Sequence, residues 1–207
     1  MVKPISQTME KTEKISTETK ILAAAETVFL KSGYDGSRMQ EIADLAGINK
    51  AMLHYYFRSK DALFERIFEQ KFSQFFPKIQ ELMAMPISFT EKVCIYVELH
   101  TNLLRQNPYL PLFIINTVHK NNDFVKKMPL LLLSEFVKSY YTDLAANKVK
   151  ELNPIQFLMS VMSMCVFPFL SKPILCSLVN ISNQDFDILM NNRPEEIKRY
   201  VRAILTP

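Results

Sequence analysis

Apolar residues recur at helical spacing along most of the chain. Residues 17–31 place their apolar side chains on one face of a helix: Ile21, Leu22, Ala25, Val28 and Phe29. A second apolar run follows Ser59, a residue type that often caps helices, and Pro77 is expected to end or kink that helix. We find no segment that alternates apolar and polar residues as half-buried strands do. The pattern therefore predicts an all-α chain.

Capping residues and prolines mark further helices. Ser88 and Glu91 have capping-box spacing, in which each side chain binds the backbone N–H of the other residue. Pro154 and Pro194 are suited to the first turn of a helix, where a missing N–H costs nothing. The sequence therefore predicts helices over 88–106, 154–170 and 194–205.

A bend at Gly47 separates two short helices between residues 38 and 57. Glycine adopts positive φ at little cost, and two short helices joined by a glycine-containing turn are typical of a helix-turn-helix. Ile42 and Leu53 are expected to face the core. The outward side chains are expected to be Lys50, Ala51, His54 and Tyr55, with Met52 at their edge.

Glycine is scarce, and this excludes some functions. The 207 residues include 3 glycines, and the glycine-rich signatures of nucleotide-binding loops are absent. The net charge of +4 is mild and does not by itself imply a nucleic-acid partner. Residues 46–60, however, contain Lys50, Arg58 and Lys60 and no acidic residue. A small basic patch suited to a phosphate backbone therefore coincides with the second short helix.

A dense set of residues between about 17 and 68 forms one pattern: Ile21 to Ala25, Phe29, Gly33, Tyr34, Ile42, Ala43, Ala46 to Lys50, Leu53, Tyr55 to Phe57, and Ser59 to Leu63. In this pattern the chain resembles the DNA-binding domain of TetR-family transcriptional regulators. The resemblance implies an N-terminal three-helix DNA-binding domain with a helix-turn-helix, and a C-terminal helical domain for effector binding and dimerisation. We expect these domains at 16–62 and 63–207, after a flexible arm at 1–15.

The resemblance also implies roles for individual residues in DNA binding. Lys50, Ala51 and His54 match positions that approach base edges in the major groove, with Met52 beside them. Phosphate contacts are implied for Ser37, Asn49, Tyr55, Tyr56 and Lys60, and Arg38 is included in the DNA-binding set. His54 stands where tyrosine is commoner in the family, and Met52 where a small hydroxyl residue is commoner. These two departures bear on which operator sequence is preferred.

Polar side chains within the apolar C-terminal helices are candidate effector contacts. They are Tyr96, His100, Asn116 and Tyr140. A few oriented polar groups among aromatic residues suit a lipophilic ligand, and the alternative for each is a structural residue with satisfied hydrogen bonds. The sequence shows no recognisable catalytic arrangement and no metal-ligand spacing, so neither an enzyme nor a cofactor is expected.

The segment 154–170 is too apolar for a helix to leave fully exposed. Together with 194–205 it is expected to form a homodimer surface, as the resemblance implies, and a central core helix is the alternative. The apolar stretch is short for a membrane span, and the charged N-terminus lacks the apolar run of a signal peptide. We expect no membrane partner and a cytoplasmic location, where Cys94, Cys165 and Cys176 would be reduced rather than disulfide-bonded.

These predictions converge on a ligand-responsive DNA-binding regulator. A repressor is favoured, which binds a palindromic double-stranded operator as a homodimer and is released by a small lipophilic effector. Two other classes remain open: an all-α small-molecule binding protein or enzyme without DNA binding, and a helical protein-interaction module. The dense match through Phe57 and Lys60 favours the regulator.

Overall fold

The computed structural model describes residues 5–112, 114–115 and 130–207. Within these residues all regular structure is helical, which confirms the predicted all-α class. The helices are α1 (Ile5–Gly36), α2 (Met39–Ala46), α3 (Lys50–Tyr56), α4 (Lys60–Ala84), α5 (Phe89–Gln106), α8 (Leu130–Ala145), α9 (Pro154–Leu170), α10 (Lys172–Val179) and α11 (Asn183–Leu205). The chain divides into unit 1 (Met1–Phe72) and unit 2 (Ser73–Pro207). The functional boundary expected at residue 62 stays a prediction.

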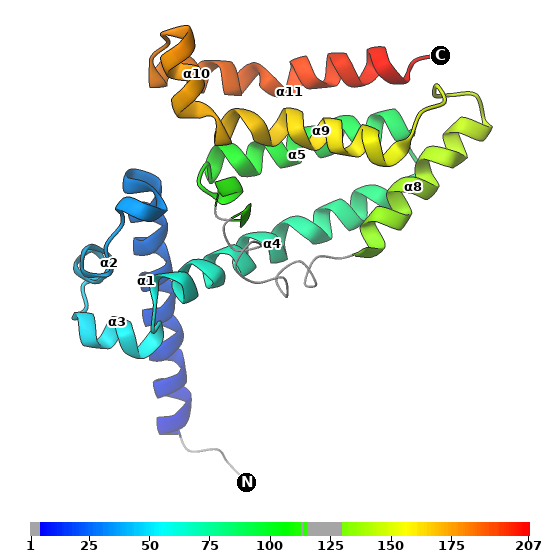
Figure 1. Ribbon diagram of the computed structural model, residues 1–207. Helices are drawn as coiled ribbons and strands as arrows, with labels where there is room; N and C mark the ends of the chain where they lie inside the picture. Colours follow the sequence, from blue (N-terminus) through cyan, green and yellow to red (C-terminus); the bar gives the residue numbers. More distant parts are fainter. Residues whose placement is uncertain (1–4, 113, 116–129) are drawn as a thin grey trace. The chain divides into compact units, whose positions relative to one another are not determined.

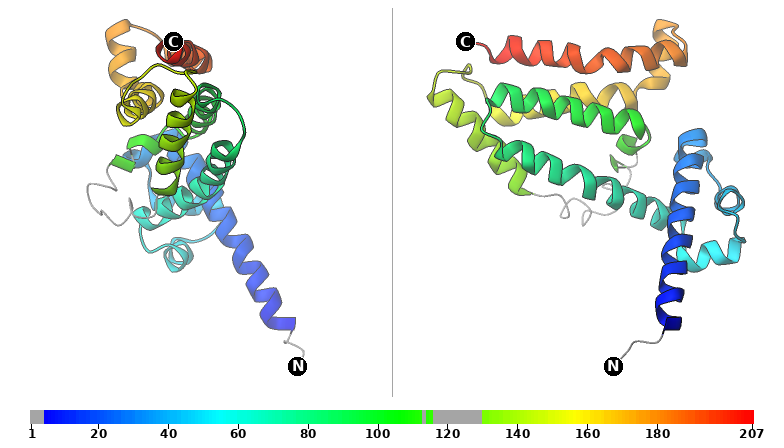
Figure 2. Two further views of the ribbon diagram at one scale, coloured as in Figure 1. Left: turned by 90° about the vertical axis from the view of Figure 1, so that its right-hand side faces the viewer. Right: turned by 180° about the vertical axis from the view of Figure 1, so that it is seen from behind.

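Unit 1 is built on α1, with α2 and α3 on the same side of it (Figure 2). Its fully buried side chains come from all four helices and include Ile21, Ile42, Leu53 and Phe64. Their burial removes the apolar faces of these helices from water, which is the main force that stabilises such a small bundle. Two ion pairs link α1 to the part of α4 in this unit, Glu18 to Arg66 at 3.1 Å and Glu26 to Lys71 at 2.8 Å.

Helix α1 begins at Ile5, inside the segment 1–15 for which the sequence predicts a flexible arm. Between Pro4 and Gly33 the chain has neither proline nor glycine, so no strong helix breaker separates that segment from the helix expected over 17–31. Gly33 has a φ of 67° and interrupts the helical backbone. The role of residues 1–15 as an arm stays a prediction.

In unit 2, α9 and α11 run side by side along α5 (Figure 1). Phe89 and Val97 of α5, Cys165 of α9 and Ile197 of α11 lie in one buried cluster. Helix α8 packs on α5 and α9 and adds Tyr140, whose exposed fraction is 0%. Of the three cysteines, all free, Cys94 and Cys165 are buried.

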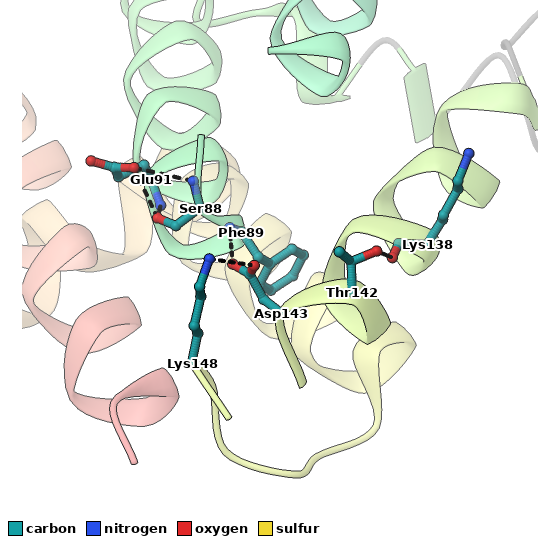
Figure 3. Close-up of polar contacts among 7 residues, drawn as sticks. All are labelled: Ser88, Phe89, Glu91, Lys138, Thr142, Asp143 and Lys148. Carbon is teal, nitrogen blue, oxygen red and sulfur yellow. Dashed lines mark hydrogen bonds and ion pairs between the residues drawn. The ribbon is translucent and has the colours of Figure 1, made fainter. Parts of the chain in front are cut away.

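The start of α5 is capped twice, as Figure 3 shows. Ser88 and Glu91 form the predicted capping box, each side chain accepting from the backbone N–H of the other residue. The buried carboxylate of Asp143, near the end of α8, accepts a 2.7 Å hydrogen bond from the backbone N–H of Phe89. Lys148 lies 3.7 Å from the same carboxylate. A negative charge at a helix N-terminus is favourable, so Asp143 joins α8 to α5.

Three prolines of unit 2 lie inside helices: Pro77 of α4, Pro168 of α9 and Pro194 of α11. Helix α4 continues past Pro77 to Ala84, so it does not end at that proline. The prediction that a helix starts at Pro194 is wrong, because α11 already begins at Asn183, after a capping box of Ser182 and Asp185. Pro168 lies inside α9, and its ring nitrogen cannot donate to the carbonyl of Met164. The guanidinium of Arg193 donates to that carbonyl at 3.3 Å instead.

Among the described residues, no helix taken alone is long and apolar enough to cross a membrane. The pair α9 and α10, bent by 72°, reaches that length and apolarity when the two are taken together.

Candidate nucleic-acid interface

The orientation of α3 is set by three neighbouring residues. Gly47 ends α2 with a φ of 69°, and its N–H donates to the carbonyls of Ala43 and Asp44. Asn49 caps α3, its side-chain oxygen accepting from Met52 N at 2.7 Å. The side chain of Leu53 packs in the core with an exposed fraction of 0% and holds α3 against it. The bend, the cap and the apolar anchor leave the opposite face of α3 to the solvent.

That opposite face presents the side chains expected from the sequence. Lys50, Ala51, His54 and Tyr55 are exposed, and Met52 is exposed at 38%. Tyr56 is half-buried, with its ring 5.6 Å from that of Tyr55. The predicted outward placement is therefore confirmed, while the contact of these residues with DNA stays a prediction.

The three other predicted DNA contacts lie at the start of α2 and of α4. Arg38 is exposed and occupies the N-cap position of α2. Ser37 is buried, and its hydroxyl donates to the Tyr34 carbonyl at 2.6 Å. The half-buried Lys60 donates from Nζ to the carbonyls of Tyr34 at 2.6 Å and Ser37 at 3.2 Å. Ser37 and Lys60 therefore hold the end of α1 in place, and one N–H of the Lys60 ammonium is left for a phosphate.

Sequence reasoning assigned no role to the pair formed by Tyr34 and Asp61. The Tyr34 hydroxyl donates to the Asp61 carboxylate, and the Lys60 ammonium lies 4.4 Å from the centre of the Tyr34 ring. Burial and the neighbouring Asp61 carboxylate raise the pKa of Tyr34. The ring also packs edge-on against Phe64 at 5.2 Å. Both residues were part of the resemblance, but only their distance in space reveals that they join the end of α1 to the start of α4.

The candidate effector residues of unit 2 differ in their hydrogen-bond partners. The Tyr96 hydroxyl and His100 Nδ1 are 2.9 Å apart, one turn from each other on α5. Tyr140 donates to the carbonyls of Lys150 and Leu152 and accepts from Leu152 N at 2.7 Å. Tyr140 therefore braces the loop between α8 and α9. Asn116 lies outside the described residues.

Metal binding finds no support in the described part of the chain. Histidine, cysteine, aspartate and glutamate side chains do not come together there in threes, as a metal site would require.

Helix α3 is short and exposed, it follows a glycine bend, and its surface is basic and free of acidic residues. These features are typical of the second helix of a helix-turn-helix. The family model for bacterial regulatory proteins of the tetR family matches residues 21–67. Residues 21–67 therefore match the DNA-binding domain of the tetR family of bacterial regulatory proteins.

Similarity to individual regulators is concentrated in unit 1. The chain is 39% identical to the transcriptional regulator RutR of Escherichia coli K12 over 67 residues, which are 32% of each chain. It is 42% identical to the transcriptional repressor NicS of Pseudomonas putida over 59 residues, or 28% of each chain. The chain thus matches about a third of the length of these relatives. They are named as regulators and not as enzymes.

The fold extends this similarity beyond unit 1. The Bacillus subtilis regulator FadR, solved in complex with stearoyl-CoA, superposes with a TM-score of 0.54 at 20% identity. The superposition covers 86% of this chain and 96% of FadR. At this level of identity the likeness shows a shared fold.

Proposed function

We propose that the protein is a ligand-responsive repressor of transcription, cytoplasmic, which binds a palindromic DNA operator as a homodimer and is released by a small lipophilic effector. The exposed face of α3 is the observation that carries the DNA-binding part. Its geometry depends on Gly47, Asn49 and Leu53, and the face is already formed without DNA. Binding a preformed face to DNA reduces the entropy cost of ordering it.

In this proposal α3 enters the major groove. Lys50, Ala51 and His54 reach base edges, with Met52 beside them, because they share the exposed face. Arg38, Asn49, Tyr55, Tyr56 and Lys60 contact phosphates around that face. Ser37 is buried with its hydroxyl bound to the Tyr34 carbonyl, and its own carbonyl accepts from Lys60 Nζ. Its proposed part is therefore to position Lys60.

The homodimer is proposed to form through residues 154–170 and 194–205. On α9, Ile155, Met159 and Met162 are exposed at helical spacing, at 39%, 57% and 42%. On α11, Tyr200 and Ile204 are exposed one turn apart. Apolar stripes of this kind are normally covered by a partner. A two-fold dimer would place its two recognition helices in successive major grooves, about 34–36 Å apart.

Effector binding is proposed for unit 2, whose helices are rich in apolar and aromatic side chains. FadR, which shares the fold, was solved with the long-chain ligand stearoyl-CoA. Helix α4 belongs to both units, so a displacement of α4 by the effector would change the separation of the two recognition helices. The coupling free energy expected for such a switch is about 1–3 kcal/mol.

The test of DNA binding compares Lys50→Ala with Lys60→Ala over a series of salt concentrations. Lys60→Ala should weaken binding to all duplexes alike and reduce the slope of log affinity against log salt by about 1, because one phosphate contact is lost. Lys50→Ala should also change the preferred sequence, at a cost of about 1–3 kcal/mol on the preferred site. Fluorescence anisotropy with operator and scrambled duplexes measures both quantities.

Lys138→Ala is the matched control, because Lys138 is an exposed lysine on α8 of unit 2. Its salt slope and sequence preference should equal those of the wild type. Wild-type binding by the Lys50 and Lys60 double variant across the salt series would show that these roles are wrong.

A further inference from the structure

Tyr96 and His100 form a polar pair among apolar side chains of unit 2. The Tyr96 hydroxyl lies 2.9 Å from His100 Nδ1. The ring of Phe75, from the part of α4 in this unit, lies 5.8 Å from the imidazole, centre to centre. Tyr96 also packs against the buried cluster that includes Cys165 of α9. Three helices thus surround the pair.

The outer nitrogen of His100, Nε2, is not sealed in the core. Among the described residues, none of the fully buried side-chain nitrogens and oxygens lacks a hydrogen-bond partner. His100 Nε2 has no partner within the described residues, and both His100 and Tyr96 keep some accessible surface. Burial nevertheless lowers the pKa of His100 to about 4 and raises the pKa of Tyr96. The pair is therefore poorly hydrated, and part of its surface nevertheless remains accessible.

The pair offers a third group one donor and one acceptor, whichever tautomer His100 adopts. If Tyr96 donates to Nδ1, the Nε2–H remains as a donor and the phenol oxygen as an acceptor. If Nδ1–H donates to Tyr96, Nε2 remains as an acceptor and the phenol O–H as a donor. A hydroxyl group satisfies both positions at once, and a carbonyl oxygen satisfies the donor.

The pair itself is uncharged near pH 7. Burial lowers the pKa of His100, which keeps the imidazole neutral, and raises the pKa of the neighbouring Cys165 thiol to about 12. The Arg193 guanidinium opposes the rise at Cys165, but it contributes to the pKa shift of neither Tyr96 nor His100. An anionic group placed here would lose its hydration without meeting a cation from the pair or from Cys165, which is unfavourable. An uncharged group loses much less.

We propose that Tyr96 and His100 bind the polar end of an uncharged, otherwise apolar effector that carries a hydroxyl or carbonyl group. The proposal rests on the function proposed above and specifies the chemistry of its effector. The proposed site should bind an alcohol or ketone more tightly than a carboxylate of the same chain length.

The test titrates the full chain, by calorimetry, with three ten-carbon probes: 2-decanol, 2-decanone and decanoate. The alcohol and the ketone should bind, and decanoate should bind at least about ten-fold more weakly, because its charge must be buried. In the ¹⁵N-labelled protein, 2-decanol should shift the Nε2 resonance of His100, a reading that needs no variant.

Two variants identify the pair as the site. Tyr96→Phe and His100→Phe should each weaken 2-decanol binding by about five- to ten-fold, because one hydrogen bond is lost. Tyr141→Phe is the matched control, since Tyr141 is 52% exposed on α8. Wild-type affinity in both pair variants, equal binding of decanoate, or no binding of either neutral probe by the folded protein would overturn the proposal.

DNA binding without any probe is measured in parallel on the same preparations. Loss of duplex affinity with intact probe binding counts against the proposed function alone. Normal salt-dependent duplex binding without probe binding counts against the Tyr96–His100 site alone.

Discussion

The two units of this chain differ in how well the role of a single residue can be predicted from the sequence. In unit 1, Gly47, Asn49 and Leu53 each meet a backbone or packing demand that few residue types can meet. In unit 2, Tyr96 and Tyr140 look alike in the sequence, yet one meets a histidine and the other braces a loop. Local geometry makes the first unit readable from residue spacing, whereas the second depends on which distant residues meet in the core.

Leu53→Ala should have the largest effect and confine it to unit 1. Leu53 is fully buried under α3, so the substitution should lower the free energy of unfolding of this unit by about 2–5 kcal/mol. Amide hydrogen exchange would show faster exchange in α1 to α3 and unchanged exchange in α9, with DNA binding lost. Leu45→Ala, at a side chain 54% exposed, is the control and should change stability by less than about 0.5 kcal/mol. Equal loss of protection in both units would contradict their separation.

The stability of unit 2 should depend on pH through His100. Burial lowers the pKa of His100 from 6.5 to about 4, so between these values the unfolded state binds a proton that the folded state does not. Stability should therefore fall as the pH drops from 6.5 towards 4, by on the order of 3 kcal/mol in total. Urea unfolding at several pH values measures this, and His100→Gln should remove this part of the slope. An identical slope in the variant would show that His100 is hydrated.

Tyr140→Phe should separate the two tyrosines of unit 2. The hydroxyl of Tyr140 binds two carbonyls and one N–H of the loop after α8. Its removal should cost about 1–3 kcal/mol, because partly buried backbone groups lose their partner, while 2-decanol binding stays unchanged. Tyr141→Phe, on the exposed side of α8, should be neutral. Weakened 2-decanol binding with full thermal stability would instead make Tyr140 part of the effector site.

Gly47→Ala should have the smallest effect of the four, about 1–2 kcal/mol, because its φ of 69° strains any residue with a Cβ. No atom lies within 4 Å of the added Cβ, so the cost is one of backbone strain alone. Gly36→Ala is the control: Gly36 lacks positive φ, and the new Cβ would lie at an ordinary 3.6 Å from Ser32 Cβ. Thermal unfolding should show a lower melting temperature for Gly47→Ala and an unchanged one for Gly36→Ala. Equal melting temperatures would mean that the bend tolerates alanine.

Residue spacing was sufficient for the helix-turn-helix, the capping box at Ser88 and the bounds of α9. It failed at Pro194, because a proline inside a helix and one in a first turn look the same without the preceding cap at Ser182. Contacts between residues far apart in the chain were also beyond it. The two carbonyls at the end of α1 that bind the Lys60 ammonium were not foreseen, and the phosphate contact of Lys60 stays a prediction.

The central proposal is that the exposed face of α3 reads DNA. Selection of genomic fragments by the purified full-length protein tests it most directly, with Ala51→Glu as the matched variant. Ala51 is exposed, so an acidic side chain there repels phosphates without disturbing the core. We predict that the wild type recovers fragments sharing a near-palindromic site with half-sites about one helical turn apart, and that the variant recovers none. Unselective recovery by the wild type, or the same fragments with Ala51→Glu, would contradict the proposal.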